Sequence, residues 1–418
     1  MRAAHEPPRR VWDTLRLVAS SGGPGRCEFA LNNACNANCG FCNFARDSLP
    51  KKHWEYVDYQ GALDAVDILF REGIRYLILT GGEPTLHRDL TGIIGHASRK
   101  GMKVMLVSNG GLFKAQRIGD YAGAGLSSFV ISIDAATAQE HEDNRGLPGV
   151  CDKVREANRE ITSRGLISTA SVTLSRLLEI DALPAFLDDL GFKAVTFSYP
   201  LTNLNSSFLG YRDSGIVNFT REELIALFDK VKALKSRIHV VNPTRSLEEM
   251  QRFLRNEPQN FPCLGGYRYF YLDWKLQLWR CHFWEKPLCS IYEFDESKLV
   301  RDGCTRCIID CYRDASTIQH VAVSAHDAVR SLRLVDFAGA AKASFARVTP
   351  DRSTPCSKNC RGSCGFDCVS LRYDRTGLRR ISALASWACQ ANTDGRPSAM
   401  SGTRLTNESA SASAAGIP

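Results

Sequence analysis

The sequence has neither a long apolar run nor a block of like charges, and both absences exclude classes of protein. A membrane-spanning helix requires roughly 18–20 consecutive apolar residues, and no stretch of the 418 residues meets that requirement. The basic N-terminus, MRAAHEPPRRVW, is followed by no sustained apolar segment, so a secretory signal is not expected. The net charge of +8 is spread along the chain, without the Lys/Arg block of a nucleic-acid-binding tail. We therefore expect a cytoplasmic protein with no membrane span and no nucleic-acid partner.

Cysteine, by contrast, is abundant. Sixteen cysteines are present, and in a reducing compartment disulfides do not explain that number. Most of them fall into three groups, at 35–42, 263–311 and 356–368. Clustered thiols of this kind indicate metal or iron–sulfur ligation. Isolated cysteines are expected to be small core residues instead. They are Cys27, Cys151 and Cys389.

Residues 27–240 alternate short apolar runs with amphipathic stretches. Six runs predict strands, at 27–31, 76–80, 104–108, 128–133, 168–174 and 194–199. Apolar strands separated by helices indicate parallel strands that are buried on both faces. The pattern predicts an α/β fold, an open, partial (β/α)6 barrel with its chemistry at the carboxyl ends of the strands.

The chain divides into five regions by composition. Residues 1–24 form an N-terminal extension, and 25–240 form the partial barrel. Residues 260–311 are rich in cysteine and aromatics and predict a small second domain with a hairpin over 267–280. Residues 312–391 are helix-permissive and contain cysteines, and 392–418 have the composition of a disordered tail.

The most informative motif is Cys35-Asn-Ala-Asn-Cys39-Gly-Phe-Cys42, directly after the first predicted strand. Three thiolates on one short loop can hold three corners of a four-iron cube and leave the fourth iron open, as catalytic metal sites require. The alternative is a structural zinc loop with its fourth ligand elsewhere. Zinc loops usually show CxxC pairs, which this spacing does not match.

This CxxxCxΦC pattern, in which Phe41 is the aromatic residue Φ, resembles the signature of the radical S-adenosylmethionine (SAM) superfamily. The resemblance implies a radical SAM type of barrel and a SAM-binding 4Fe-4S cluster on Cys35, Cys39 and Cys42. It also implies reductive cleavage of SAM to a 5′-deoxyadenosyl radical that abstracts hydrogen from a substrate. An electron donor such as flavodoxin or ferredoxin is implied as well. The protein itself would hold the cofactor and exclude water from the radical.

A second motif follows the second strand. Thr80-Gly81-Gly82-Glu83-Pro84 resembles the family's GGE motif, which holds the amino group of SAM. Two glycines let the backbone approach a ligand, and a carboxylate can accept a hydrogen bond from an ammonium group. The resemblance implies further SAM contacts at Phe41, Ser108, Asn109, Ser132, Asp134 and Arg145. For Phe41 the alternative is simple packing, and for Arg145, in the segment Arg-Gly-Leu-Pro-Gly, it is a surface turn.

The cysteines after residue 260 resemble a SPASM or shorter twitch extension, which holds auxiliary 4Fe-4S clusters. A CxxC pair is present, but the next cysteine follows after three residues instead of five, so a full SPASM pattern is not matched. We expect one auxiliary cluster that draws on Cys263, Cys281, Cys304, Cys307 or Cys311, with a structural zinc knot as the alternative. A further metal-site candidate recurs every four residues, at Cys356, Cys360, Cys364 and Cys368.

Fold and cofactor do not fix the substrate. A small-molecule or lipid biosynthetic precursor is the leading expectation. Many peptide-modifying relatives carry a leader-binding domain, for which the 34 residues before Cys35 are too few. A cyclase of molybdenum cofactor synthesis would end in Gly-Gly, whereas this sequence ends in Ala-Gly-Ile-Pro. A further alternative is a non-enzymatic zinc-binding or nucleic-acid-binding protein. The GGE motif and the six βα units argue against it.

Overall fold

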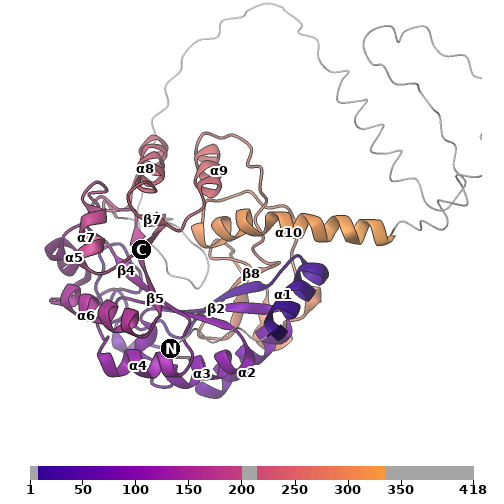
Figure 1. The fold of residues 1–418 in the computed structure, drawn as a ribbon, viewed down its shortest axis with the longest axis horizontal. Helices are drawn as coiled ribbons and strands as arrows, with labels where there is room; N and C mark the ends of the chain where they lie inside the picture. The colour runs from indigo at the N-terminus through magenta and orange to yellow at the C-terminus, as the bar shows by residue number, and fades with distance from the viewer. Residues whose placement is uncertain (1–7, 200–213, 335–418) are drawn as a thin grey trace, which may run out of the picture. The chain divides into compact units, whose positions relative to one another are not determined.

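The computed structural model describes residues 8–199 and 214–334, and it confirms an α/β fold built on a curved parallel sheet (Figure 1). The strands are β1 Gly25–Ala30, β2 Ile74–Thr80, β3 Lys103–Ser108, β4 Ser128–Ile133, β5 Ile167–Thr173, β6 Ala194–Ser198, β7 His239–Val240, β8 Tyr269–Leu272, β9 Gln277–Trp279 and β10 Cys289–Ser290. The α-helices of the described residues are α1 Pro8–Ser21, α2 Tyr59–Arg71, α3 Leu90–Lys100, α4 Ala115–Gly123, α5 Ala138–Arg145, α6 Val150–Ser163, α7 Leu183–Asp189, α8 Arg221–Leu234, α9 Thr244–Leu254 and α10 Asp310–Leu334. None of these helices is long and apolar enough to cross a membrane.

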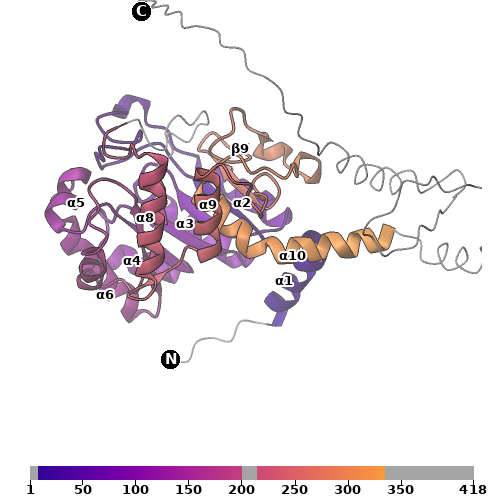
Figure 2. The ribbon, with the colours of Figure 1, turned by 90° about the horizontal axis from the view of Figure 1, so that it is seen from above.

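The sheet runs in the order β10-β9-β8-β1-β2-β3-β4-β5-β6-β7, and neighbours from β8 through β1 to β7 are parallel. Helices α2 to α6 lie along its outer, convex side (Figures 1 and 2). Because each crossover returns the chain to the same end of the sheet, the loops after the strands gather at one edge. That edge is where the sequence motifs lie.

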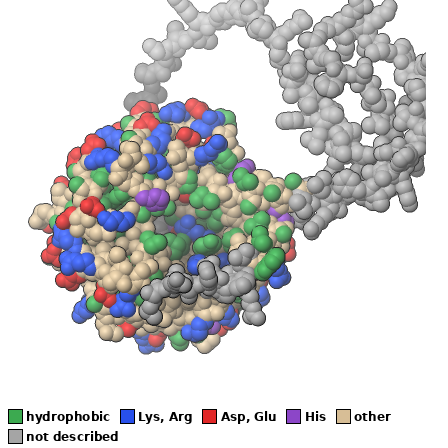
Figure 3. Space-filling model, in the orientation of Figure 1, with side chains coloured by type: hydrophobic (Ala, Val, Ile, Leu, Met, Phe, Trp, Pro, Cys, Tyr) green, Lys and Arg blue, Asp and Glu red, His purple; other side chains and the backbone are tan. Residues whose placement is uncertain are grey.

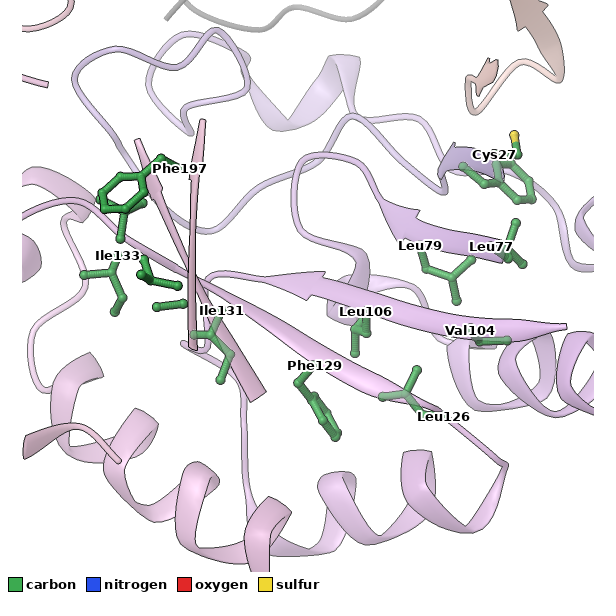
Figure 4. Packing of buried hydrophobic residues seen from close by; sticks show 14 of the residues in the cluster. Cys27, Leu77, Leu79, Val104, Leu106, Leu126, Phe129, Ile131, Ile133 and Phe197 are labelled. Atoms are coloured by element: carbon green, nitrogen blue, oxygen red, sulfur yellow. The ribbon is translucent and has the colours of Figure 1, made fainter. Parts of the chain in front are cut away.

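A row of large apolar side chains holds the sheet to its helices. Phe29 pairs with Leu79, Leu79 with Leu106, and Leu106 with Phe129 on neighbouring strands, so the four side chains share one face. All four are fully buried, and Figure 4 shows three of them side by side above the outer helices. Phe129 also meets Phe113 edge to face, with 5.7 Å between ring centroids. This row forms the centre of the main hydrophobic core.

The helices begin where local hydrogen bonding favours them. Asp58 caps α2, since its carboxylate accepts from the backbone N–H of Gly61 at 2.9 Å. Thr220 and Glu223 form a capping box at the start of α8. Such caps satisfy backbone groups that would otherwise lack partners at the helix ends.

The sheet is larger than the six predicted strands. β7 extends it past β6, and the cysteine-rich region adds β8 beside β1, with Arg26 paired to Tyr269. Residues 269–290 thus continue the barrel sheet instead of forming a separate sheet. The helices α1, α4, α5 and α9 were not expected from the sequence either. The cysteine group 356–368, Cys389 and the tail 392–418 lie outside the described residues.

Helix α10 joins the two sides of the partial barrel. On one side its Asp310 accepts from the hydroxyl of Ser198, at the end of β6, at 3.4 Å. On the other side Tyr269 of β8 donates to the carbonyl of Ala315 at 3.0 Å. Gln319 donates to the carbonyl of Gly22, just before β1, at 2.9 Å. The first half of α10 therefore bridges from β6 to β1 and β8 (Figure 1).

Replacing Phe129 with Ala tests the packing of the central row. We expect the free energy of unfolding to fall by about 3–5 kcal/mol, since a buried aromatic side chain is lost and a cavity remains. The matched control is Ile167→Ala on β5, where the side chain is exposed, with an expected change below about 1 kcal/mol. Urea unfolding followed by circular dichroism measures both. Similar losses for the two variants would contradict the assignment of this core.

Candidate active site

The three motif cysteines lie on the loop that follows β1. Cys35 and Cys39 are each 7% exposed, and Cys42 is partly buried. The loop turns tightly, with the N–H of Cys42 donating to the carbonyl of Cys39 at 3.1 Å. Burial raises the pKa of each of the three thiols to about 12. Because metal ligation needs thiolates, binding at this loop must displace the protons.

The thiols do not converge on a single point. Within residues 8–199 and 214–334, no three His, Cys, Asp or Glu side chains are arranged to hold one metal ion. Ligands of a four-iron cube bind different irons, so they lie farther apart than the ligands of one ion. Three thiols on one loop, with a buried cation described below, are a donor set that fits a 4Fe-4S cluster.

The GGE turn after β2 touches this loop through its backbone. The N–H of Gly82 donates to the carbonyl of Asn32 at 3.0 Å, and the N–H of Glu83 donates to that of Ala34 at 2.7 Å. A Cβ atom on Gly82 would lie 2.2 Å from the carbonyl oxygen of Ala34, and one on Gly81 would lie 2.4 Å from that of Asn32. Gly81 also has a φ of +136°, which side chains disfavour. Both positions therefore require glycine.

The carboxylate of Glu83 is 0% exposed and connects the ends of β2 and β3. Its Oε1 accepts from Ser108 Oγ at 2.9 Å and from the N–H of Thr85 at 3.0 Å. Its Oε2 accepts from the N–H of Asn109 at 2.8 Å. Burial raises the pKa of Glu83 above its usual range. Glu83, which was predicted to face an ammonium group, thus also holds the ends of β2 and β3 together.

Asn109 carries this connection on to the cysteine loop. Its Nδ2 donates to Asn36 Oδ1 at 2.8 Å and lies 3.9 Å from the sulfur of Cys35. The structure therefore brings together Glu83, Ser108, Asn109 and Cys35, which the sequence placed at three different strand ends.

A buried ion pair lies beneath the same loop. Arg145 Nη2 is 2.7 Å from Asp134 Oδ1, and Asn144 Nδ2 donates to Asp134 Oδ2 at 2.9 Å. The carbonyl of Arg145 accepts from the N–H of Asn38 between the cysteines, at 2.7 Å. Arg145 is only 6% exposed, so the surface-turn alternative for it is wrong. Its positive charge lowers the pKa of all three motif thiols, against the larger effect of burial.

The two remaining predicted contacts differ in their surroundings. Ser132 lies on the same face of β4 as Val130, which lines the barrel interior. Phe41 is buried in a cluster with the aromatic side chains of the β8–β9 hairpin, which packs over the cysteine loop. Sequence reasoning missed His141 and Asn144. His141 Nδ1 accepts from the N–H of Asp134 at 3.1 Å, and burial lowers its pKa to about 4, so it is neutral.

Four cysteines of the second group lie near one another. The backbone N–H of Cys263 donates to the carbonyl of Cys304 at 2.8 Å. Charge on Cys263, Cys281 and Cys304 raises the pKa of Cys307, in addition to the larger effect of burial. The four residues come from the segment before β8, the end of β9 and the loop before α10, and we call them the cysteine quartet. Four thiolates are a complete ligand set for a cluster.

Cys311 has different surroundings. It lies in the first turn of α10 and faces the barrel interior, where its sulfur is 3.8 Å from Asp310 Oδ2. Burial raises its pKa well above the usual range, and charge on Asp310 and Glu28 adds to that rise. Cys311 thus faces the barrel interior, although it also packs against the same apolar cluster as Cys263, Cys281 and Cys307.

A buried arginine lies beside the quartet. Arg313 is 0% exposed, and among the described residues none of its three side-chain nitrogens has a hydrogen-bond partner. Its Nη2 is 3.7 Å from Glu249 Oε2, and its charge lowers the pKa of Cys263. An unsatisfied guanidinium is costly to bury. A negatively charged thiolate-ligated cluster would compensate it, so these residues fit such a group.

The barrel encloses a cavity of about 380 Å³. Ile78, Met105 and Val107 supply an apolar wall from β2 and β3. Hydroxyl groups from β5 and β6 supply a polar wall, and the first turns of α10 close it with Asp310, Cys311 and Asp314. The face turned to the viewer in Figure 3 is hollowed near its centre. A cavity enclosed by the sheet, with Thr80 before the GGE turn in its lining, is where a substrate would be held.

Comparison with known proteins identifies the core of this arrangement. The model of the radical SAM superfamily matches residues 30–190, the segment that carries the cysteine loop, the GGE turn and the Asp134–Arg145 pair. Residues 30–190 are a radical SAM domain. The domain includes the loop after β1 and the strands β2 to β5 with their helices.

Curated relatives share this domain over a limited span. An AdoMet-dependent heme synthase of Methanosarcina barkeri is 30% identical over 138 residues, covering 33% of this chain and 39% of that protein. A probable GTP 3′,8-cyclase of Metallosphaera sedula is 31% identical over 135 residues, covering 32% and 42%. The match thus spans about two-fifths of the length of these relatives.

The solved structures that match this chain do so at low sequence identity and with TM-scores below 0.5. SuiB of Streptococcus suis, bound to the precursor peptide SuiA, has a TM-score of 0.49 at 12% identity and covers 75% of this chain and 77% of that one. Native anSMEcpe with bound AdoMet has a TM-score of 0.48 at 13% identity and covers 74% and 99%.

Substituting Gly82 with Ala tests the contact between the two loops. The new Cβ would collide with the carbonyl of Ala34, so the cysteine loop must shift, and we expect a several-fold loss of iron at this loop. Gly123→Ala is the control, because no atom lies within 4 Å of a Cβ there. Iron is measured in both variants after anaerobic reconstitution, with the quartet cysteines replaced by Ala. Equal iron in the two would show that the contact is dispensable.

Proposed function

We propose that this chain is a radical SAM enzyme. It cleaves SAM reductively and abstracts hydrogen from a small-molecule or lipid biosynthetic substrate held in the barrel cavity. The observation that carries the proposal is the cysteine loop after β1, tied by backbone hydrogen bonds to the GGE turn and lying over a buried Arg145–Asp134 pair. The radical SAM domain match over residues 30–190 supports it.

The residues that would hold the cofactors are those assembled at the strand ends. Cys35, Cys39 and Cys42 would ligate the 4Fe-4S cluster, which when bound supplies the electron that splits SAM into methionine and a 5′-deoxyadenosyl radical. Gly81 and Gly82 let the GGE turn come close to the cysteine loop, and the turn would thereby lie beside the amino acid part of SAM. Oε2 of Glu83 accepts from Asn109 and has a second lone pair for a ligand ammonium.

The fixed charge of Arg145 has two roles in this scheme. It stabilises the thiolate forms of the loop cysteines, and its backbone carbonyl holds the loop in place through Asn38. Asp134 keeps the guanidinium from being an uncompensated buried charge. Ser132 and Asp134 end β4 near the ligand, at the position proposed for the ribose.

The aromatic hairpin excludes water from the loop. Tyr271, Trp274 and Trp279 pack against Cys35, Cys39 and Phe41. Phe44 meets Trp274 edge to face, with 5.9 Å between ring centroids. A dry surrounding protects a reactive radical from side reactions.

The substrate is proposed to enter the barrel cavity. Its volume of about 380 Å³ lies at the small end of the range typical of small-molecule sites, and its apolar wall suits a hydrocarbon body. A one-electron donor such as flavodoxin or ferredoxin completes the reaction, because the chemistry starts with the transfer of an electron.

We also propose one auxiliary 4Fe-4S cluster, on the cysteine quartet and not on Cys311. In a variant with Cys35, Cys39 and Cys42 changed to Ala, about four iron atoms per chain should remain. Adding Cys307→Ala should remove most of them, whereas adding Cys311→Ala should leave them. Iron analysis and Mössbauer spectra distinguish these cases. Bound zinc in place of iron would support a structural zinc knot, and iron loss in the Cys311 variant would return that residue to the ligand set.

Formation of 5′-deoxyadenosine tests the proposed reaction. The anaerobically reconstituted, reduced protein should convert SAM to 5′-deoxyadenosine and methionine, and the triple Ala variant at Cys35, Cys39 and Cys42 should lose at least about a hundredfold in rate, since the open iron is removed. Liquid chromatography measures the product. Equal product from both proteins would contradict the assignment of the loop.

A further inference from the structure

One end of the barrel cavity is acidic. Asp310 and Asp314 lie four residues apart on α10, so both project from the same face of the helix. Both line the cavity, as do Ala315 and Ile318 of the same stripe. Neither belongs to the cysteine loop or to the quartet, and the cofactor scheme leaves both without a role.

The acidic end contains polar atoms without partners. Asp314 Oδ2 accepts from Asn242 Nδ2 at 2.6 Å, whereas among the described residues its Oδ1 has no hydrogen bond of normal geometry, although the nearby hydroxyl of Ser246 lowers the pKa of Asp314. Tyr199 also lines the cavity and is 2% exposed, and its hydroxyl has no partner within the described part of the chain either. Charge on Asp314, Asp310 and Cys311 raises the pKa of Tyr199, in addition to the larger effect of burial, which places the phenol beside both acids. Buried polar atoms of this kind normally have partners.

The charges around the cavity leave an excess of carboxylate. Arg26 is paired with Glu28 at 2.6 Å, and burial lowers the pKa of the adjacent His282 to about 4, so that imidazole is neutral. Lys235 donates to the carbonyl of Asn242 at 2.6 Å and is the other cation near Asp314. Within residues 8–199 and 214–334, the three carboxylates Glu28, Asp310 and Asp314 therefore face the two cations Arg26 and Lys235, and both cations already have partners.

Burial in the cavity wall disfavours the charged forms of Asp310 and Asp314. Burial and the neighbouring carboxylate raise the pKa of Asp310 to about 7, and burial raises that of Asp314 to about 6. A ligand that brings a positive charge and several N–H donors would both pair the carboxylates and satisfy the open oxygen atoms. A ligand amine has that chemistry.

We propose that the cavity takes a substrate with an apolar body and a protonated amine, and that Asp310 and Asp314 bind the amine while β2 and β3 hold the body. This substrate class rests on the proposed function, since it assumes that the barrel cavity is the substrate site. Binding itself needs neither SAM nor electrons, so it is measured separately from catalysis.

The test compares three probes of equal length and different charge. Hexylamine, 1-hexanol and hexanoate are titrated into the full-length, reconstituted protein without reductant, and their affinities are measured by isothermal titration calorimetry and saturation-transfer NMR. Hexylamine should bind about tenfold tighter than hexanol, and hexanoate weakest. The chain's net charge of +8 opposes unspecific amine binding, so a preference for the amine reports a local site.

Variants locate the site. Asp310→Asn and Asp314→Asn should each remove most of the preference for hexylamine over hexanol. Asp327→Asn is the matched control, because it makes the same change on the same helix at a half-exposed carboxylate that pairs with Arg301 outside the cavity. Circular dichroism and thermal unfolding identify any variant that fails to fold. The wild-type comparison of the three probes needs no variant.

Equal binding of hexylamine and hexanol by the wild type would overturn the proposal, as would tighter binding of hexanoate. Retention of the preference in both Asp310→Asn and Asp314→Asn, correctly folded, would also overturn it. If these results came with normal formation of 5′-deoxyadenosine, the substrate class would fail and the proposed reaction would stand. Amine selectivity without SAM cleavage would support the amine site and contradict the proposed reaction.

Discussion

The geometry of this protein depends on a backbone ladder that continues past the ends of two strands. β1 and β2 pair in parallel, and the N–H of Leu31 still donates to the carbonyl of Thr80 at 2.9 Å. Beyond it, the N–H groups of Gly82 and Glu83 bind the carbonyls of Asn32 and Ala34. The loop with three cysteines and the turn with the GGE motif are thereby fixed against each other, before any side chain contributes. The close approach explains why both positions of the Gly-Gly pair must lack a Cβ.

Side chains on either side of these backbone hydrogen bonds hold the cysteine loop in place. On one side, Glu83 collects donors from β3, and Asn109 passes the connection to Cys35. On the other side, Arg145 and Asp134 form a buried pair under the loop. The aromatic hairpin of the cysteine-rich region covers it from outside. Helix α10 then links the two sides of the barrel and carries acids into its cavity, directly after the quartet cysteine Cys307.

The local pattern of the sequence predicted the local structure well. The strand β4 has the predicted bounds, because its hydrophobic run and the residues that end it are contained in one short segment. The pairing of β8 with β1 was not predicted, since the two strands are distant in sequence and no local signal specifies a partner. The inward position of the charged residues Arg26 and Glu28 was not predicted for the same reason, because it depends on the pairing of β1 with β8.

In the candidate active site, too, contiguous motifs were predicted and contacts between distant segments were not. The three cysteines, the two glycines and Glu83 are contiguous motifs, and the structure brings them together. Asp310 and Asp314 were not singled out from the sequence, because Asp310 precedes the segment 312–391 that was expected to be helix-permissive. What the sequence cannot show is that this face of α10 turns toward a barrel formed by residues far away. Likewise, the place of Cys311 in the cavity lining follows from the start of α10 at Asp310, which the cysteine spacing alone does not reveal.

The most direct test of the central claim is electron paramagnetic resonance of the reduced protein with and without SAM, in the Cys263→Ala, Cys281→Ala, Cys304→Ala and Cys307→Ala background. If the loop after β1 holds a cluster with one open iron, the reduced sample should show a 4Fe-4S signal whose g values change when SAM is added. Changing Cys35, Cys39 and Cys42 to Ala should abolish that signal. A signal that SAM leaves unchanged, or no iron signal at all, would contradict the account.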